Sequence, residues 1–173
     1  CGDCFMKAVN LTSLARTILV ADLVDTPDPC HIEVSSEDLA KLAQAYDVED
    51  AAMLRADVEV SRHGSLIRVA GSLEADLGRI CVVSLESMRE LIAEDFAVQY
   101  TMNSLPEAEG ELEADLDAPE PLGGDVLDLG DVVLEQLVLA MDPHPKKEGA
   151  SPPIDPGAGQ ESSPFDVLKQ LKS

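Results

Sequence analysis

The chain has 173 residues and a mass of 18.4 kDa, enough for one domain with a hydrophobic core and additional tails. It contains 12 Lys and Arg residues and 34 Asp and Glu residues, and the resulting net charge of −22 disfavours tight binding of nucleic-acid phosphates. Aromatic residues make up 3% with no Trp, which excludes the base-stacking surface of single-strand-binding proteins. Hydrophobic residues reach 45%, too many for a wholly disordered chain, and no apolar run approaches the length of a membrane span.

Residues 1–9 are expected to lie outside the domain, as a leader or as vector-derived sequence, with Met6 as the natural start. The alternative, in which Cys1-Gly2-Asp3 begins a mature bacterial lipoprotein, stays open. The four cysteines, at positions 1, 4, 30 and 81, do not form a disulfide framework and indicate a reducing, cytoplasmic setting.

The first third of the domain is predicted to contain two short strands and a helix. Residues 17–22 include an apolar run that predicts a strand, residues 25–29 carry two prolines typical of a turn, and residues 30–34 alternate weakly as a second strand. Ser35 stands three residues before Asp38, a spacing typical of a helix N-cap. Apolar residues at helical spacing then predict a short amphipathic helix from Ser36 to Tyr46.

The middle of the chain is predicted to form an antiparallel sheet. Apolar and polar residues alternate over 54–60 and again over 67–77, with the Gly-containing turn 62–64 between them. In the first run Arg55 is expected to share a face with Asp57 and Glu59. A third alternating run, 92–100, extends the hairpin.

The remaining third combines a loop, a helix and a tail. Residues 102–124 are acidic and contain Pro and Gly, so we expect a disordered acidic loop. Residues 128–141 predict a helix that is apolar almost all round, and is therefore either buried or covered by a partner. Residues 142–164 hold six prolines and predict a disordered Pro-rich linker, followed by a short C-terminal helix at 165–173. The predicted fold class is α+β, a single domain over 10–141 built on an antiparallel, barrel-like β-sheet with a few short helices.

No catalytic, cofactor-binding or metal-ligating residues are predicted. Cys1 and Cys4 have metal-ligand spacing, but a structural zinc needs four ligands and the other candidates are only Cys30, His31 and Cys81. Cys81 lies in an apolar run and is interpreted as a small buried hydrophobic residue. The remaining histidines have no Ser or Cys at a position that suggests a catalytic triad. The Gly pair at 123–124 lacks the pattern of a phosphate-binding loop.

Charge is unevenly distributed along the chain. Residues 90–145 contain 15 Asp and Glu and no Lys or Arg. In the acidic loop, carboxylates alternate with smaller residues at Glu107, Glu109, Glu111 and Glu113. Two interpretations stay open for this loop: a solvated, self-repelling segment, or an acidic arm that mimics a phosphate backbone and shields a basic protein.

Three segments carry a resemblance to a known family. They read Arg-Ile-Cys-Val-Val-Ser-Leu-Glu at 79–86, Asp-Val-Leu-Asp-Leu-Gly-Asp at 125–131 and Pro-Phe-Asp-Val-Leu-Lys-Gln-Leu-Lys at 164–172. In this order and at these separations, and with Val-Ala-Gly-Ser-Leu-Glu-Ala at 69–75, the chain resembles the YceD family, the large ribosomal RNA subunit accumulation proteins of bacteria and plastids, in its alphaproteobacterial form.

The resemblance implies a non-enzymatic role in accumulation of large-subunit ribosomal RNA during ribosome assembly. Many relatives carry a second cysteine where this chain has Ser84 and a cysteine cluster after the segment that matches 143–145, so any metal site of those relatives is in doubt here. Because the net charge disfavours direct RNA contact, we expect the partner to be a basic ribosomal protein or an assembly factor. A general acidic chaperone or decoy for a non-ribosomal basic protein is the alternative. The candidate partner-binding residues are Cys81, Leu85, Glu86, Glu107, Glu109, Glu111, Glu113, Asp128, Leu129, Gly130, Asp131 and Glu135.

Overall fold

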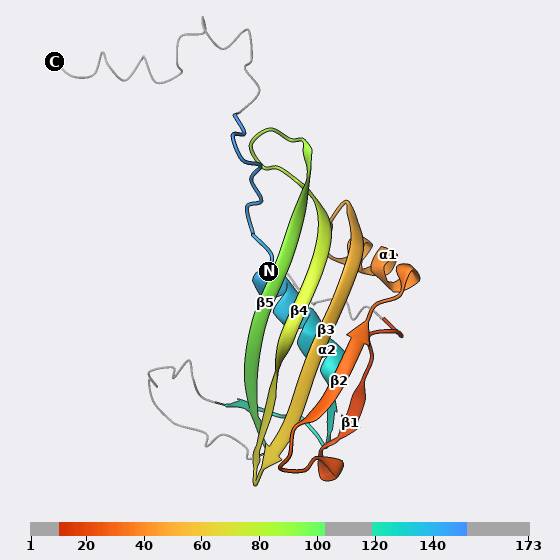
Figure 1. Cartoon of the computed structure of the whole chain (residues 1–173), viewed down its shortest axis with the longest axis vertical. Helices are drawn as coiled ribbons and strands as arrows, with labels where there is room; N and C mark the ends of the chain where they lie inside the picture. Colours follow the sequence, from red (N-terminus) through yellow and green to blue (C-terminus); the bar gives the residue numbers. More distant parts are fainter. Residues whose placement is uncertain (1–10, 103–118, 152–173) are drawn as a thin grey trace, which may run out of the picture.

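The structure, a computed structural model, describes residues 11–102 and 119–151 and consists of a long curved sheet with one helix across its inner face (Figure 1). The strands are β1 (Thr17–Leu19), β2 (Asp28–Glu33), β3 (Asp50–His63), β4 (Leu66–Ile80), β5 (Ser87–Thr101), β6 (Glu120–Pro121) and β7 (Val126–Asp128). The helices are α1 (Ser36–Ala45), α2 (Leu129–Ala140) and the 3-10 turn η1 (Val20–Asp22). Five strands form one sheet in the order β2-β3-β4-β5-β6, and β1 pairs with β7 in a second, two-stranded sheet.

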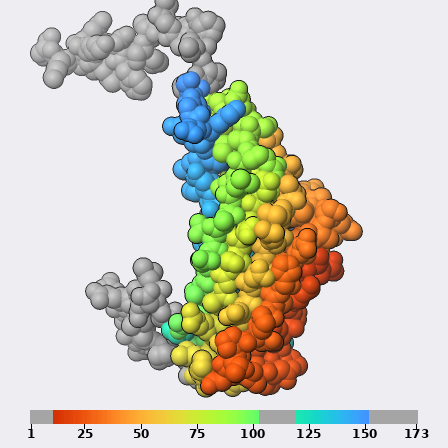
Figure 2. Space-filling view, in the orientation of Figure 1, coloured from red at the N-terminus to blue at the C-terminus, as the bar shows by residue number. Residues whose placement is uncertain are grey.

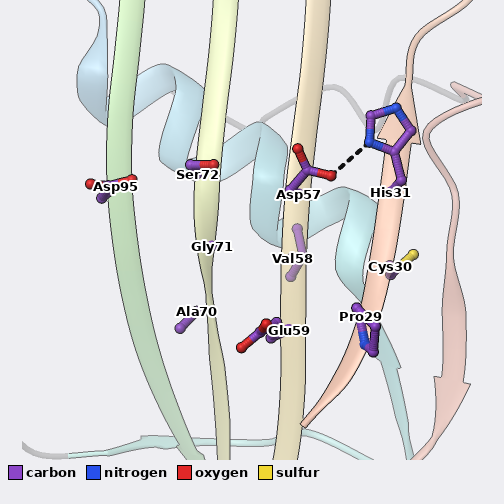
Figure 3. Close-up of a pocket in the computed structure, with 10 residues that line it drawn as sticks. All are labelled: Pro29, Cys30, His31, Asp57, Val58, Glu59, Ala70, Gly71, Ser72 and Asp95. Atoms are coloured by element: carbon purple, nitrogen blue, oxygen red, sulfur yellow. Dashed lines mark hydrogen bonds and ion pairs between the residues drawn. The ribbon is translucent and has the colours of Figure 1, made fainter.

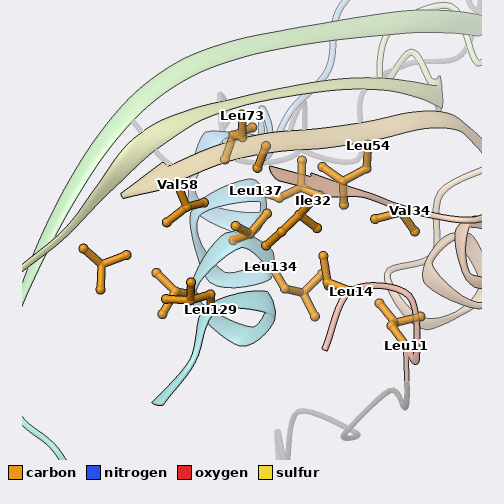
Figure 4. Close-up of a cluster of buried hydrophobic side chains, with 14 of the residues drawn as sticks. Leu11, Leu14, Ile32, Val34, Leu54, Val58, Leu73, Leu129, Leu134 and Leu137 are labelled. Atoms are coloured by element: carbon orange, nitrogen blue, oxygen red, sulfur yellow. The ribbon is translucent and has the colours of Figure 1, made fainter. Parts of the chain in front are cut away.

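The alternating segments form β3, β4 and β5, as predicted, and each strand is longer than its alternating run. All three pair antiparallel, and among the described strands only the two-residue β6 runs parallel to its neighbour. Alternate side chains such as Val58, Val69 and Leu73 are at most 1% exposed and form the core together with α2 (Figure 4). The β3–β4 turn uses Gly64, whose φ of 64° lies in the left-handed region that glycine tolerates.

Helix α1 begins where the sequence predicts. Ser35 caps it, because its hydroxyl accepts a 3.3 Å hydrogen bond from the Asp38 amide. The Asp38 carboxylate is 2% exposed and accepts hydrogen bonds from the Ser13 amide at 2.7 Å and the Ser13 hydroxyl at 2.6 Å. Lys41 pairs with the same carboxylate at 2.8 Å. One buried carboxylate therefore fixes the N-terminal segment against α1.

Helix α2 is anchored at its first turn and buried along one side. The Asp128 carboxylate caps the helix by accepting from the Gly130 amide at 2.8 Å, and it also accepts from the Arg16 amide at 2.9 Å. Leu129 and Leu137 are fully buried, whereas Leu139 is 72% exposed. The prediction of an apolar helix is confirmed, but its apolar surface divides into a core face and an exposed flank.

The predicted barrel is not found among the described residues. The five-stranded sheet is open, with β2 at one edge and β5 and β6 at the other, because α2 covers the core face that a closed barrel would enclose. In the same orientation, Figure 2 shows the outer face of β2 to β5 with no helix over it. No helix in the described ranges is long and apolar enough to cross a membrane.

Several predicted boundaries differ from the structure. The strand predicted at 17–22 ends at Leu19 and continues as η1, and the strand predicted at 30–34 begins two residues earlier, at Asp28. The predicted acidic loop 102–124 includes β6 at its end, and the predicted linker is ordered over 142–151. The leader at 1–9, the loop residues 103–118 and the C-terminal helix at 165–173 lie outside the described residues.

Candidate functional site

The loop that joins β4 to β5 is a compact turn around Cys81. The Cys81 amide donates to the Glu86 carbonyl and the Leu85 amide donates to the Cys81 carbonyl, both at 2.9 Å. Leu85 takes a left-handed backbone with φ of 59°, which is strained for a branched side chain, and its side chain is 69% exposed. The thiol of Cys81 is fully buried inside the turn, as predicted for a small hydrophobic residue.

Residues 142–151, predicted as the start of the linker, pack onto this turn. The Val82 amide donates to the Pro145 carbonyl at 2.9 Å, and the Lys147 amide donates to the Cys81 sulfur at 3.3 Å. The Lys147 ammonium pairs with the Glu86 carboxylate at 3.1 Å. Figure 2 shows this segment in blue against the green surface of β5. Backbone pairing explains why a Pro-containing segment is ordered here, and composition does not reveal such pairing.

A largely buried ion pair holds the beginning of the docked segment. Arg79 and Glu90 pair at 2.6 Å with side chains only 12% and 13% exposed. Both also bind the backbone of Asp142, Arg79 by donating to its carbonyl at 2.9 Å and Glu90 by accepting from its amide at 2.7 Å. The pair therefore fixes the point at which the chain leaves α2.

Hydrogen-bond donors surround the Cys81 sulfur. The Ser84 side chain and the backbone amides of Ser84, Lys147 and Val83 lower the pKa of the Cys81 thiol to about 6. The Ser84 and Lys147 amides lie 3.4 and 3.3 Å from the sulfur and donate hydrogen bonds to it. This lowered pKa was not predicted, since the donors come from residues 84 and 147, which only the fold brings to the sulfur.

The Cys81 turn does not fit a metal. Ser84 and the segment after Pro145, where the family resemblance led us to look for a metal site, come together here, but they offer a hydroxyl and backbone amides. Among the described residues no group of three His, Cys, Asp or Glu side chains is placed to hold a metal ion.

A shallow hollow of about 460 Å³ lies on the outer face of the sheet (Figure 3). Its centre is a row of strand neighbours, in which His31 pairs in register with Asp57, Asp57 with Ser72, and Ser72 with Asp95. The His31 imidazole contacts the Asp57 carboxylate at 2.7 Å. Because Asp57 lies between His31 and Ser72, the histidine is not placed to activate the serine hydroxyl, as a catalytic triad requires.

Small residues and carboxylates give the hollow its shape and charge. Ala70 and Ser72 leave room over β4, while Asp57, Glu59 and Asp95 surround it. Arg55 shares this face with Asp57 and Glu59, as predicted, and is neutralised by a 2.6 Å pair with a carboxylate of β4. The hollow itself was not predicted, although alternation alone places these carboxylates on one face of the sheet.

The predicted partner-binding residues fall into separate places. Cys81, Leu85 and Glu86 belong to the β4–β5 turn, at the end of the sheet opposite to the start of α2 (Figure 1). At that start Asp128, Leu129 and Gly130 are occupied by capping and packing, whereas Asp131 and Glu135 are exposed. Burial and the neighbouring Asp128 raise the pKa of Asp131. The remaining candidates, Glu107, Glu109, Glu111 and Glu113, lie outside the described residues.

A family model supplies the decisive comparison. The model described as large ribosomal RNA subunit accumulation protein YceD matches residues 69–172, which is more than half of the chain. The chain belongs to the YceD family. The YceD match begins within β4 and includes the β4–β5 turn, β5, α2 and the docked segment 142–151. The resemblance predicted from the sequence is therefore confirmed, while its alphaproteobacterial form stays a prediction. No curated protein and no solved structure matches the chain.

Proposed function

We propose that this YceD family member acts in the cytoplasm as a non-enzymatic ribosome-biogenesis factor that binds a basic ribosomal protein or assembly factor. The family description implies a role in accumulation of the large-subunit ribosomal RNA. Protein binding rather than catalysis is the mode that the described surface favours. In this view the acidic surface holds the basic partner until the RNA accepts it.

The observation that carries the proposal is a set of carboxylates with no cationic partner. Glu59, Glu94 and Asp95 are exposed on or beside the sheet, and no described Lys, Arg or His pairs with them. Such uncompensated charge accelerates association with a basic protein and makes the binding sensitive to salt.

Four of the five arginines of β3 to β5 are engaged in contacts within the chain. Arg55, Arg79 and Arg89 pair with carboxylates, and Arg62 donates to the Val20 and Gly64 carbonyls. The fifth, Arg68, is exposed on β4. An arginine committed to such partners is not available for phosphate contacts, which dominate affinity for RNA. These contacts favour a protein partner.

The test is gradient sedimentation of lysate containing the tagged full chain, with co-migrating proteins identified by mass spectrometry. We expect co-migration with large-subunit precursors or one basic ribosomal protein, lost as salt rises. The Glu59→Gln/Asp95→Asn variant should lose the partner at lower salt than the Asp22→Asn/Asp28→Asn control, which removes two exposed carboxylates elsewhere. If the protein from growing cells migrates as a free species in a low-salt gradient, the proposal is contradicted. A non-ribosomal basic partner favours the chaperone alternative.

A further inference from the structure

The outer edge of β5 is a long stretch of unpaired backbone. β5 pairs with β4 along its whole length, but on its other side only Tyr100 and Thr101 pair, with β6. No backbone hydrogen bond joins that side of residues 87–99 to any other described part of the chain. The opposite edge of the sheet, β2, is six residues long and contains Pro29. Open amide and carbonyl groups of this kind form a template for a further strand.

The β5 edge lacks three of the features that keep strand edges from pairing, namely Lys, Pro and a β-bulge. The strand contains neither Lys nor Pro, and its register with β4 is continuous, without a bulge. Its one cation, Arg89, is engaged with Asp50 and Asp76. The edge is therefore regular and accessible over its middle, residues 91–99, which border the sheet in Figure 1.

A groove of about 360 Å³ lies between the middle of β5 and α2. Phe96 and Leu139 line it with Gln136, and Leu139 is 72% exposed although it follows the buried Leu137. Because side chains alternate along a strand, every second residue of a segment added beside β5 would lie on the α2 side of the sheet. The groove is lined on β5 by residues 94–96, so it accepts one side chain of the added segment, next to Leu139.

The surroundings of the groove are acidic. Glu94 faces the α2 side of the sheet and Asp95 the outer side, since neighbouring strand residues point to opposite faces. Glu135 of α2 is also exposed. None of the three pairs with a cation in the part of the chain that the structure describes. A segment that pairs with β5 would meet negative charge on both of its faces.

We propose that residues 91–99 of β5 bind an extended, Lys- and Arg-rich segment of the partner protein as an added strand, with an apolar side chain against Leu139. The proposal rests on the proposed function and names the binding site for its basic partner. Main-chain hydrogen bonds supply affinity in this mode, and the alternating side chains supply specificity. A second copy of this chain fits poorly, because antiparallel pairing of two β5 edges about their middle places Glu94 and Asp95 of both copies together.

The test uses the full chain and a labelled synthetic peptide of alternating Lys and Val, with a peptide of the same composition in two blocks as control. Binding is measured by fluorescence anisotropy, and hydrogen exchange locates the protected amides. We expect the alternating peptide to protect amides of residues 91–99 and the block peptide to bind more weakly. Glu94→Gln/Asp95→Asn should weaken binding roughly three- to tenfold, and Leu139→Ser roughly fivefold.

Matched control variants remove the same kinds of side chain, exposed carboxylates and an exposed apolar residue, at positions away from β5. Asp22→Asn/Asp28→Asn neutralises two exposed carboxylates away from β5, and Val24→Ser removes an apolar side chain that is 58% exposed. Both should leave binding unchanged. Equal loss in the controls, or protection at the hollow around Asp57 in place of 91–99, overturns the proposal. Alternate amides of 91–99 bond to β4 and are protected in the free chain. If the other amides of 91–99, which point away from β4, are also protected in the free chain, by a second copy or by the chain's own residues 152–173, the proposal is overturned as well.

The outcomes separate this proposal from the function on which it rests. If co-migration with ribosomal precursors persists unchanged in the Glu94→Gln/Asp95→Asn and Leu139→Ser variants, the proposed function stands and the β5 site is wrong. If the peptide protects β5 but no ribosomal partner co-migrates, the site stands and the proposed function is wrong.

Discussion

Replacing Gly71 with Ala should destabilise the fold through a backbone clash at the centre of the β3–β4 pair. A Cβ built at Gly71 lies 2.2 Å from the Asp57 carbonyl oxygen and 2.9 Å from the Val58 Cα, whereas ordinary contacts begin at 3.4 Å. Both obstacles are backbone atoms, so no side-chain rotation relieves them. The two strands must separate by more than an ångström or twist differently.

The magnitude follows from two opposing effects. Forcing an extra methyl group into packed structure costs about 1–3 kcal/mol, and Gly→Ala recovers about 0.4–1 kcal/mol by restricting the unfolded chain. We expect a net loss of about 1.3 kcal/mol. For a chain of this size that loss lowers Tm by roughly 3–5 °C.

The assay is thermal and urea unfolding followed by far-UV circular dichroism, with Gly124→Ala as the matched control. A Cβ at Gly124 meets nothing within 4 Å, so that variant should melt at or slightly above the wild-type temperature. Equal melting of the two variants would refute the close approach of β3 and β4 at Gly71. Gly71 also lines the outer hollow, so the same substitution should alter hydrogen exchange at Asp57 and Ser72.

Three further predictions concern buried contacts, and one concerns the acidic loop. Hydrogen bonds from Lys41 and then Ser13 hold the pKa of Asp38 below its usual range. The ionised carboxylate therefore stabilises the fold above about pH 4, and this stabilisation is lost as the pH falls below that value. In Asp38→Asn, the free energy of unfolding from urea titrations should depend less on pH in the acid range. The pKa of Cys81 is lowered to about 6, so the stability difference between wild type and Cys81→Ala should grow from pH 6 to pH 9, and a constant difference would contradict a stabilised thiolate. Glu90→Gln should speed hydrogen exchange and proteolysis within 142–151, whereas Glu74→Gln, at an exposed ion pair, should not. In the acidic loop, the residues to replace with Gln are Glu107, Glu109, Glu111 and Glu113. The free energy of unfolding should not change, whereas partner binding should weaken. Unchanged affinity at low salt would contradict the acidic-arm interpretation.

Patterns among neighbouring residues predicted the strands and helices of this fold, but not that the sheet stays open. Strict alternation identified β3 to β5, and the Ser35–Asp38 spacing identified the start of α1, because both patterns act through neighbours in the chain. The openness of the sheet was not predictable in this way. It depends on α2 lying across the core face, and α2 is positioned by Asp128 reaching back to Arg16.

The functional surfaces were predicted only in part, for a related reason. Exposure of Glu86 and Glu135 agrees with a role in binding, but Leu129 and Gly130 are used in packing, and a sequence motif does not separate the two uses. The groove beside Leu139 arises where β5 and α2 come together. Proline content predicted a disordered linker from 142, yet the Arg79–Glu90 pair orders its first residues through contacts more than 50 positions away.

The pairing of β1 with β7 has a consequence for synthesis of the chain. Thr17 lies opposite Asp128, its partner 111 residues later, so β1 cannot pair until α2 is about to emerge from the ribosome. At 5–20 residues per second the wait is roughly 5–20 s. During that interval the hairpin of β3 and β4 can form, whereas Leu11 and Leu14, which are buried in the finished core, remain exposed. Strand β1 therefore waits longer for its partner strand than any strand of the five-stranded sheet waits for its own, and chaperones that act on nascent chains have a correspondingly long opportunity there.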